Sequence, residues 1–96
     1  MFVGNYLDGI LIYMKTITIY STATCGFCKM LKSYLASKDI PFEMKMADED
    51  QAIAQELYEQ SGQLGVPFTL ISEEGKEDIK ILGFDRPKFD EVLGLA

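Results

Sequence analysis

The two cysteines are the residues of this sequence best suited to chemistry. They stand three positions apart, in the segment Cys25-Gly26-Phe27-Cys28. On a helix, this spacing brings both thiols to one face. A thiolate can attack a disulfide, and a neighbouring thiol can then resolve the mixed disulfide that forms. The pattern therefore predicts a redox pair that cycles between dithiol and disulfide.

The elements around the pair indicate which thiol attacks. A β-branched run at 16–20 predicts a strand, residues 21–24 form a polar loop, and apolar residues recur at helical spacing over 25–38. Unpaired N–H groups and the dipole at a helix start stabilise an anion. We therefore predict that Cys25 is the nucleophile and Cys28 the resolving thiol. Lys29 and Lys32 are interpreted as ordinary solvated helix surface.

Two other roles for the cysteine pair are less favoured. A zinc site needs about four ligands, and the chain has no histidine. A purely structural disulfide would close almost no loop at this spacing. The lack of histidine also excludes Ser-His and Cys-His catalysis. We expect no metal site.

The rest of the chain alternates strand and helix patterns. We expect a strand at 40–46, a helix with Asp48–Asp50 in its first turn that runs to about Ser61, and strands at 66–71 and 78–82 joined as a hairpin. Asp85 should cap a last helix with Pro87 in its first turn and Phe89, Val92 and Leu93 buried. The order β-α-β-α-β-β-α predicts an α/β fold, with one four-stranded sheet and helices on its faces.

Two further motifs are candidate substrate contacts. A cis Val66-Pro67 bond would leave the backbone of Val66 free to pair with an extended substrate, whereas a trans proline would only start an edge strand. Backbone N–H groups at Gly83-Phe84-Asp85 would donate hydrogen bonds to a peptide carboxylate, unless the Asp85 cap occupies them. Phe27 and Phe84 either form an apolar rim for a protein partner or pack inward.

Length and composition narrow the class of protein. The chain has 96 residues, 48% of them hydrophobic, and a net charge of −6, so we expect one globular domain that binds no nucleic acid. Its apolar runs are far shorter than the roughly 20 residues that span a membrane. Residues 1–13 lack the basic start of a signal peptide. We therefore expect a cytoplasmic protein.

The domain boundary is expected near Met14. We interpret residues 1–13 as an appendage, which an upstream start codon in the gene assignment would explain, and residues 14–96 as the domain. The alternative is a short edge strand or a docking segment.

Three segments in this order resemble the glutaredoxin family over residues 15–95: Thr24-Cys-Gly-Phe-Cys-Lys29, Gly65-Val-Pro67 and Gly83-Phe-Asp85. The sequence looks most like the short redoxins of the YruB and NrdH type, which share the Ser61–Pro67 pattern. The resemblance implies a thioredoxin-like fold, a nucleophilic first cysteine and a cis-proline opposite it. The substrate-binding residues it points to are Thr24, Phe27, Val66, Pro67, Gly83, Phe84 and Asp85.

The sequence departs from glutathione-using members of that family. Those typically carry a lysine three residues before the nucleophile, where this chain has Thr22. They also have a Gly-Gly-Cys-Asp-Asp-like segment in place of Gly83-Phe-Asp85. We expect no bound cofactor, with glutathione entering only as a reductant.

The leading hypothesis is a monomeric oxidoreductase that reduces disulfides on protein substrates. Either glutathione or a thioredoxin reductase would supply its electrons. Because Cys-Gly-Phe-Cys is similar to the Cys-Gly-Phe-Ser of monothiol glutaredoxins, an iron–sulfur cluster carrier is the first alternative. A binding module whose thiols do not turn over is the second.

Overall fold

The computed structural model of the protein describes residues 15–94, which contain four strands and three helices. In chain order these are β1 (Lys15–Ser21), α2 (Gly26–Ser37), β2 (Glu43–Met46), α3 (Gln51–Ser61), β3 (Phe68–Glu73), β4 (Ile79–Leu82) and α4 (Arg86–Leu93). The order predicted from the sequence is confirmed. The appendage proposed for residues 1–13 lies outside the described residues.

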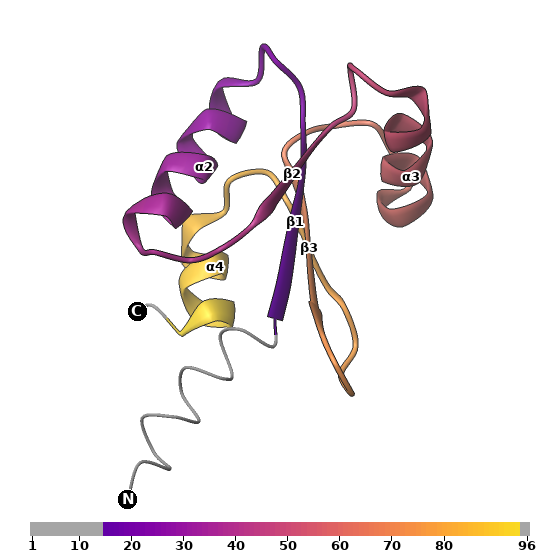
Figure 1. Ribbon diagram of the computed structural model, residues 1–96. Coiled ribbons are helices and arrows are strands. Elements are labelled where there is room, and N and C mark those ends of the chain that lie inside the picture. The colour runs from indigo at the N-terminus through magenta and orange to yellow at the C-terminus, as the bar shows by residue number, and fades with distance from the viewer. Residues whose placement is uncertain (1–14, 95–96) are drawn as a thin grey trace, which may run out of the picture.

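The four strands form one mixed sheet in the order β2-β1-β3-β4. β1 runs parallel to β2 and antiparallel to β3, and β3 and β4 form the predicted hairpin. α2 and α4 cover one face of this sheet, and α3 covers the other (Figure 1). Among the described residues, no helix is long and apolar enough to cross a membrane.

β1 is the centre of the fold because both of its faces are buried. Ile17 and Ile19 point into a core shared with α2 and α4, whereas Tyr20 lies in a second, smaller core beneath α3. Period-two alternation explains this division, since successive side chains of a strand point to opposite faces. The larger core is completed by Leu31, Tyr34, Leu35, Ile40, Ile71, Ile81 and Phe89.

Some predicted element bounds are wrong, for local reasons. The strand expected at 40–46 begins only at Glu43, since Pro41 has no N–H to give to a ladder. The strand expected at 66–71 begins at Phe68 and ends at Glu73. The acidic residues expected in the first turn of α3 precede it: Asp50 is the N-cap, and its carboxylate accepts the N–H of Ala52 at 2.9 Å.

The last helix largely matches its prediction. Asp85 is the N-cap of α4, and Pro87 lies in the first turn. Phe89 is completely buried, whereas Val92 and Leu93 are only partly buried against the larger core. The expectation that all three are buried is therefore correct for Phe89 alone.

Candidate functional site

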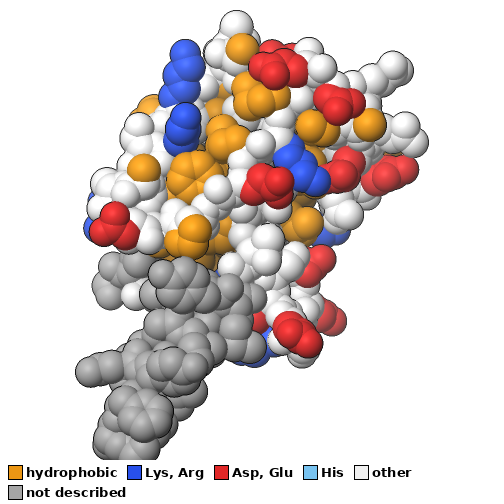
Figure 2. All heavy atoms as spheres, in the orientation of Figure 1, with side chains coloured by type: hydrophobic (Ala, Val, Ile, Leu, Met, Phe, Trp, Pro, Cys, Tyr) orange, Lys and Arg blue, Asp and Glu red, His pale blue; other side chains and the backbone are white. Residues whose placement is uncertain are grey.

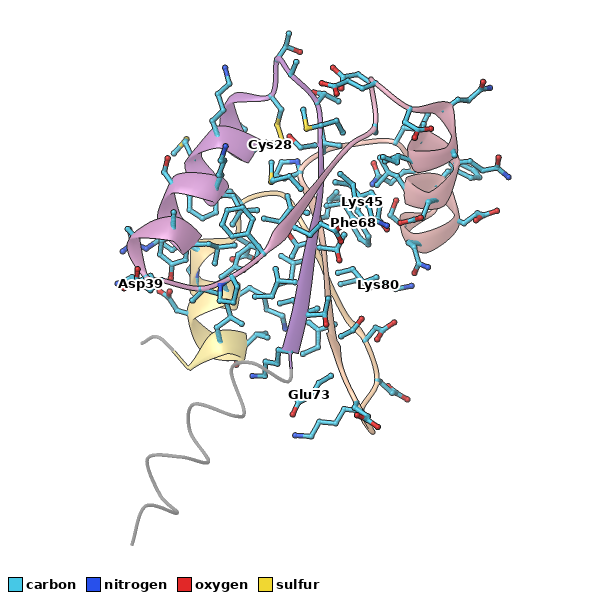
Figure 3. All side chains as sticks on the ribbon, viewed as in Figure 1. Cys28, Asp39, Lys45, Phe68, Glu73 and Lys80 are labelled. Carbon is cyan, nitrogen blue, oxygen red and sulfur yellow. A yellow bond between two sulfur atoms is a disulfide. The ribbon has the colours of Figure 1, made fainter. Side chains whose placement is uncertain are left out.

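Cys25 and Cys28 are joined by a disulfide at the start of α2. Cys25 is the N-cap, with extended backbone, and its sulfur accepts the N–H of Cys28 at 3.1 Å. The two residues differ in access to solvent. Cys25 is partly exposed, whereas Cys28 is only 1% exposed and faces the interior. The cysteine at the helix start is therefore the accessible one, and Cys28 lies on the side of α2 that faces the sheet (Figure 3).

The loop before Cys25 is fixed by the neighbouring strand connection. The N–H of Ala47 donates to the carbonyl of Ser21 at 2.8 Å, and the N–H of Ala23 donates to the Asp48 carboxylate at 2.9 Å. Within this loop, the N–H of Cys25 donates to the carbonyl of Thr22 at 3.3 Å. Thr24 is exposed and lies next to the nucleophile in the chain. β2 and the connection that follows it therefore help to place Cys25.

The strand register brings the three sequence motifs to one edge of the sheet. Tyr20, near the end of β1, pairs with Phe68, which also pairs with Leu82 at the end of β4. The N–H of Gly83 then donates to the carbonyl of Pro67 at 2.8 Å. The cysteine loop, the proline and the start of α4 thus share this edge, although up to 58 residues separate Cys25 from Gly83.

The bond between Val66 and Pro67 is cis, as the sequence analysis favoured. Pro67 is buried, whereas Val66 is partly exposed at the sheet edge. The loop leading to them is held by Gln63, whose amide contacts both sides of it. Its nitrogen donates to the Ser61 hydroxyl at 3.1 Å and to the Gly65 carbonyl at 3.2 Å, while its oxygen accepts the N–H of Gly65.

Sequence reasoning gave no role to Ser61 or Gln63. Ser61 ends α3, and Gln63 lies after it between Gly62 and Gly65. The available signal was their place in the Ser61–Pro67 pattern, whose polar and glycine residues are also typical of an ordinary turn. The left-handed φ of 76° at Gly62 ends α3 and turns the chain into this loop.

The start of α4 fits the alternative of a self-capped helix. Asp85 accepts the N–H of Lys88 at 3.3 Å, and the N–H of Gly83 is already bonded to Pro67. Phe84 packs inward, with its ring 5.6 Å from that of Tyr34 and 6.3 Å from that of Phe89. Phe27, by contrast, is 63% exposed. Of the two aromatic rim candidates, Phe27 has the more open position.

A charged cluster lies on the other side of the sheet, beneath α3. The Tyr20 hydroxyl donates to the Glu56 carboxylate, which also pairs with the Lys45 ammonium at 2.7 Å. Burial, and then the bond to Glu56, raises the pKa of Tyr20, while the bond from Lys45, followed by that from Tyr20, lowers the pKa of Glu56. Lys45 and Phe68 point toward this side in Figure 3. The cluster joins β1, β2 and α3.

Comparison with known proteins identifies the family. The glutaredoxin family model matches residues 17–75. The chain belongs to the glutaredoxin family. A glutaredoxin-like 8.6 kDa protein from the rubredoxin operon of Clostridium pasteurianum is 38% identical over 77 residues, which cover 80% of this chain and 96% of that protein.

Other relatives agree with this glutaredoxin assignment. The thioredoxin-like protein YosR of Bacillus subtilis strain 168, derived from the SPbeta prophage, is 34% identical over 72% of this chain and 82% of its own. The crystal structure of the glutaredoxin from Methanosarcina mazei Go1 has a TM-score of 0.68 at 25% identity, covering 83% of this chain and 79% of that one. The fold is thioredoxin-like, as the resemblance implied.

Proposed function

We propose that this glutaredoxin-family protein is a dithiol oxidoreductase that reduces disulfides on protein substrates. The observation that carries the proposal is the unequal exposure of the two joined sulfurs. Cys25 caps α2 at the surface, whereas Cys28 is buried one turn behind it. An accessible sulfur suits attack on an external disulfide, and a buried one suits attack on its neighbour alone.

The reaction begins with the reduced pair. The Cys25 thiolate attacks one sulfur of the substrate disulfide, forms a bond to it, and expels the other substrate sulfur as a thiolate, which takes up a proton. The Cys28 thiol gives up its proton and attacks the sulfur of Cys25. That step forms the Cys25–Cys28 disulfide and releases the second substrate thiol. Two electrons pass to the substrate.

Residues at the same sheet edge position the substrate in this proposal. The partly exposed backbone of Val66 pairs with an extended segment around the substrate disulfide. Thr24 and Phe27, both exposed, contact that segment from the cysteine side. Pro67, buried beneath Val66, fixes the direction of its backbone. Gly83, Phe84 and Asp85 support this edge from behind through the bond to Pro67 and the α4 cap.

The proposed reaction needs an electron donor and a reducing compartment. Glutathione or a thioredoxin reductase supplies two electrons to restore the dithiol, and the cytoplasm provides the reducing compartment in which a lone Cys-x-x-Cys pair works. The protein acts as a monomer, with no bound cofactor.

A coupled reduction assay tests the proposal. Wild-type protein and the Cys25→Ser variant are given insulin or a peptide mixed disulfide, once with glutathione and glutathione reductase and once with thioredoxin reductase. We expect turnover by wild type with at least one couple and none by Cys25→Ser. Absence of turnover with both couples would overturn the proposal. A coloured dimer on isolation would then favour the cluster carrier, and a colourless monomer the binding module.

A further inference from the structure

A shallow, open groove of about 510 Å³ lies between α2 and the start of α4, close to the disulfide in the chain but largely outside the residues assigned above. Lys29 and Met30 follow Cys28 directly in the chain and form its near end. The groove therefore starts within one helical turn of the resolving thiol. Its lining is Lys29, Met30, Ser33, Tyr34, Ser37, Phe84 and Arg86.

Two exposed apolar side chains and one buried ring lie along α2 from the cysteine pair to this groove. Phe27, Met30 and Tyr34 have the spacing i, i+3, i+7, which places them on one face of α2. Phe27 is 63% exposed and Met30 is 53% exposed, whereas Tyr34 forms part of the groove wall. Large apolar side chains exposed in a row are typical of protein-contact surfaces. Met30 has no role in the reaction described above.

The charge around the groove is opposite to that of the whole protein. The residues that line the groove include Lys29 and Arg86 and no Asp or Glu, whereas Asp85 is exposed next to Arg86 in the chain and the whole protein carries a net charge of −6. The Arg86 guanidinium lies 5.1 Å from the centre of the Tyr34 ring, and the Lys38 ammonium lies 5.9 Å from it. Figure 2 shows lysine side chains over α2, while most acidic side chains in that view lie over β2, α3 and the β3–β4 turn.

We propose that this groove binds a segment of a partner protein in which an apolar side chain is flanked by acidic side chains. Met30 and the Tyr34 and Phe84 rings would receive the apolar side chain, and Lys29 and Arg86 would face the carboxylates. A short segment is favoured because its few acidic side chains would contact Lys29 and Arg86 only. An extended polyanion would also meet the acidic remainder of the protein. Rim charges of this kind speed association, and a buried apolar anchor slows release.

One consequence of this inference rests on the proposed function: as an oxidoreductase, the protein would prefer disulfides flanked by acidic residues. Binding itself requires no turnover and can be measured on the oxidised protein. The probes are two fluorescent, cysteine-free synthetic peptides with the same Leu-Phe centre, one flanked by Glu and Asp and the other by Lys. Fluorescence polarisation with the full-length chain gives both affinities.

We expect the acidic peptide to bind about tenfold more tightly than the basic one at low salt, and we expect the difference to shrink as salt rises. Arg86→Glu should weaken the acidic peptide by about tenfold. Lys88→Glu is the matched control, because it makes the same charge change in α4 at a residue that does not line the groove. Acidic residues in the first turn of a helix are favourable, so both variants should keep α4 folded.

Met30→Ser separates the apolar contact from the charges. This variant should weaken both peptides by about fivefold, because each loses the same apolar contact. Equal binding of the acidic and basic peptides by wild type would overturn the inference. Equal effects of Arg86→Glu and Lys88→Glu would also overturn it, since the net charge alone would then explain the selectivity.

A reduction assay distinguishes this inference from the proposed function. Two peptide disulfides, one with acidic and one with basic flanking residues, are given to the reduced protein. Selective binding without reduction of either would overturn the proposed function and leave the groove assignment standing. Reduction of both at equal rates, with equal peptide binding, would overturn the groove assignment and leave the proposed function standing.

Discussion

At the scale of single residues, the position on α2 divides the work between two chemically identical thiols. Cys25 is outside the first turn and caps it, so its sulfur remains at the surface near the backbone N–H groups. Cys28 is inside the helix and turned toward the core. The difference in exposure follows from the helical turn between the two residues and from the sheet and α4, which pack against the inner face of α2.

Cys28→Ser should stop the reaction after its first step. Because the resolving thiol is lost, Cys25 stays bonded to the substrate, and reduced protein mixed with a peptide disulfide should accumulate a one-to-one adduct. Intact-protein mass spectrometry measures the adduct. Cys25→Ser is the control and should form no adduct at the same time points. Equal adduct formation by both variants would contradict the assigned order of attack.

Gln63→Ala should weaken substrate binding more than chemistry. Its amide ties Ser61 to Gly65, so its loss should loosen the loop that carries Val66. We expect the KM for a peptide disulfide to rise about threefold, close to the effect of one lost hydrogen bond, with little change in reactivity toward a small aromatic disulfide. Gln51→Ala, at an exposed position that begins α3, is the control. An equal loss toward both substrates would contradict this role.

The position of the cysteine pair at the start of a helix could be predicted from the sequence, whereas the contacts of Gln63 could not. Cys-x-x-Cys at a strand–helix junction has few other uses, and its spacing alone places the thiols on one face. The amide of Gln63 forms hydrogen bonds within its own loop. These contacts depend on the direction that the chain takes after the left-handed Gly62. The pattern of residue types does not predict these side-chain contacts.

At the scale of elements, the Tyr20–Glu56–Lys45 cluster is the main polar tie between the sheet and α3. The carboxylate of Glu56 accepts hydrogen bonds from both the Tyr20 hydroxyl and the Lys45 ammonium. Leu57, at 1% exposed, is the one buried residue of α3. We therefore expect the attachment of α3 to depend on this cluster as well as on apolar packing.

Glu56→Gln should lower stability near neutral pH but not in acid. The pKa of Glu56 is lowered in the folded protein, so its contribution is present above its ordinary value of 4.5 and is lost as pH falls through the folded value. Since its side chain is 38% exposed, we expect a difference of at most about 1 kcal/mol at pH 7. Urea unfolding at pH 7 and below pH 4 measures it. A pH-independent difference would contradict this account.

The cap of α4 was predicted from the sequence, whereas Asp50, the cap of α3, was expected inside the first turn, and two strand starts were misplaced. Asp85 was recognisable because a polar residue, a proline and an apolar pattern follow in the order that a helix start requires. Glu43 and Phe68 were not recognisable as strand starts. Pro41 lies two residues before Glu43 and Pro67 lies directly before Phe68, and sequence alone does not show where strand pairing begins around a proline.

Asp85→Ala should destabilise the protein by about 1 kcal/mol through loss of the α4 cap. Asp85→Asn keeps an oxygen that can accept the N–H of Lys88 and should retain most of that stability. Denaturant unfolding of the three proteins measures the effect. If the two variants are equally destabilised, the charge of Asp85 rather than its capping hydrogen bond is responsible.

At the scale of the whole molecule, the sheet order is what assembles the site. The sequence predicted four strands in one sheet, but it did not predict that β3 would lie between β1 and β4 with its first residue opposite Tyr20. That register puts Pro67 beside the cysteine loop. The order depends on how two apolar layers cover both faces of β1, which is a property of the assembled core and not of any one segment.

Phe89→Ala tests whether that core holds the site together. Phe89 is completely buried where α4 meets α2 and the sheet, so its removal should cost about 3–5 kcal/mol. This is a large share of the roughly 5–15 kcal/mol that stabilises a typical domain. Tyr58→Ala, at a position 57% exposed on α3, should cost less than about 0.5 kcal/mol. Unfolding followed by circular dichroism and by tyrosine fluorescence measures both variants.

The two signals should also unfold together in Phe89→Ala. α2 and α4 share one core through β1, and β1 is the strand that leads into the cysteine loop. If loss of Phe89 released α4 alone, circular dichroism would show an early partial transition, and the tyrosine signal would change only in the part that comes from Tyr34, which packs against Phe84 and Arg86, while the part from Tyr20 stayed native. Separate transitions would mean that the groove and the thiols are held by different parts of the core. A single transition would mean that one packed unit positions both.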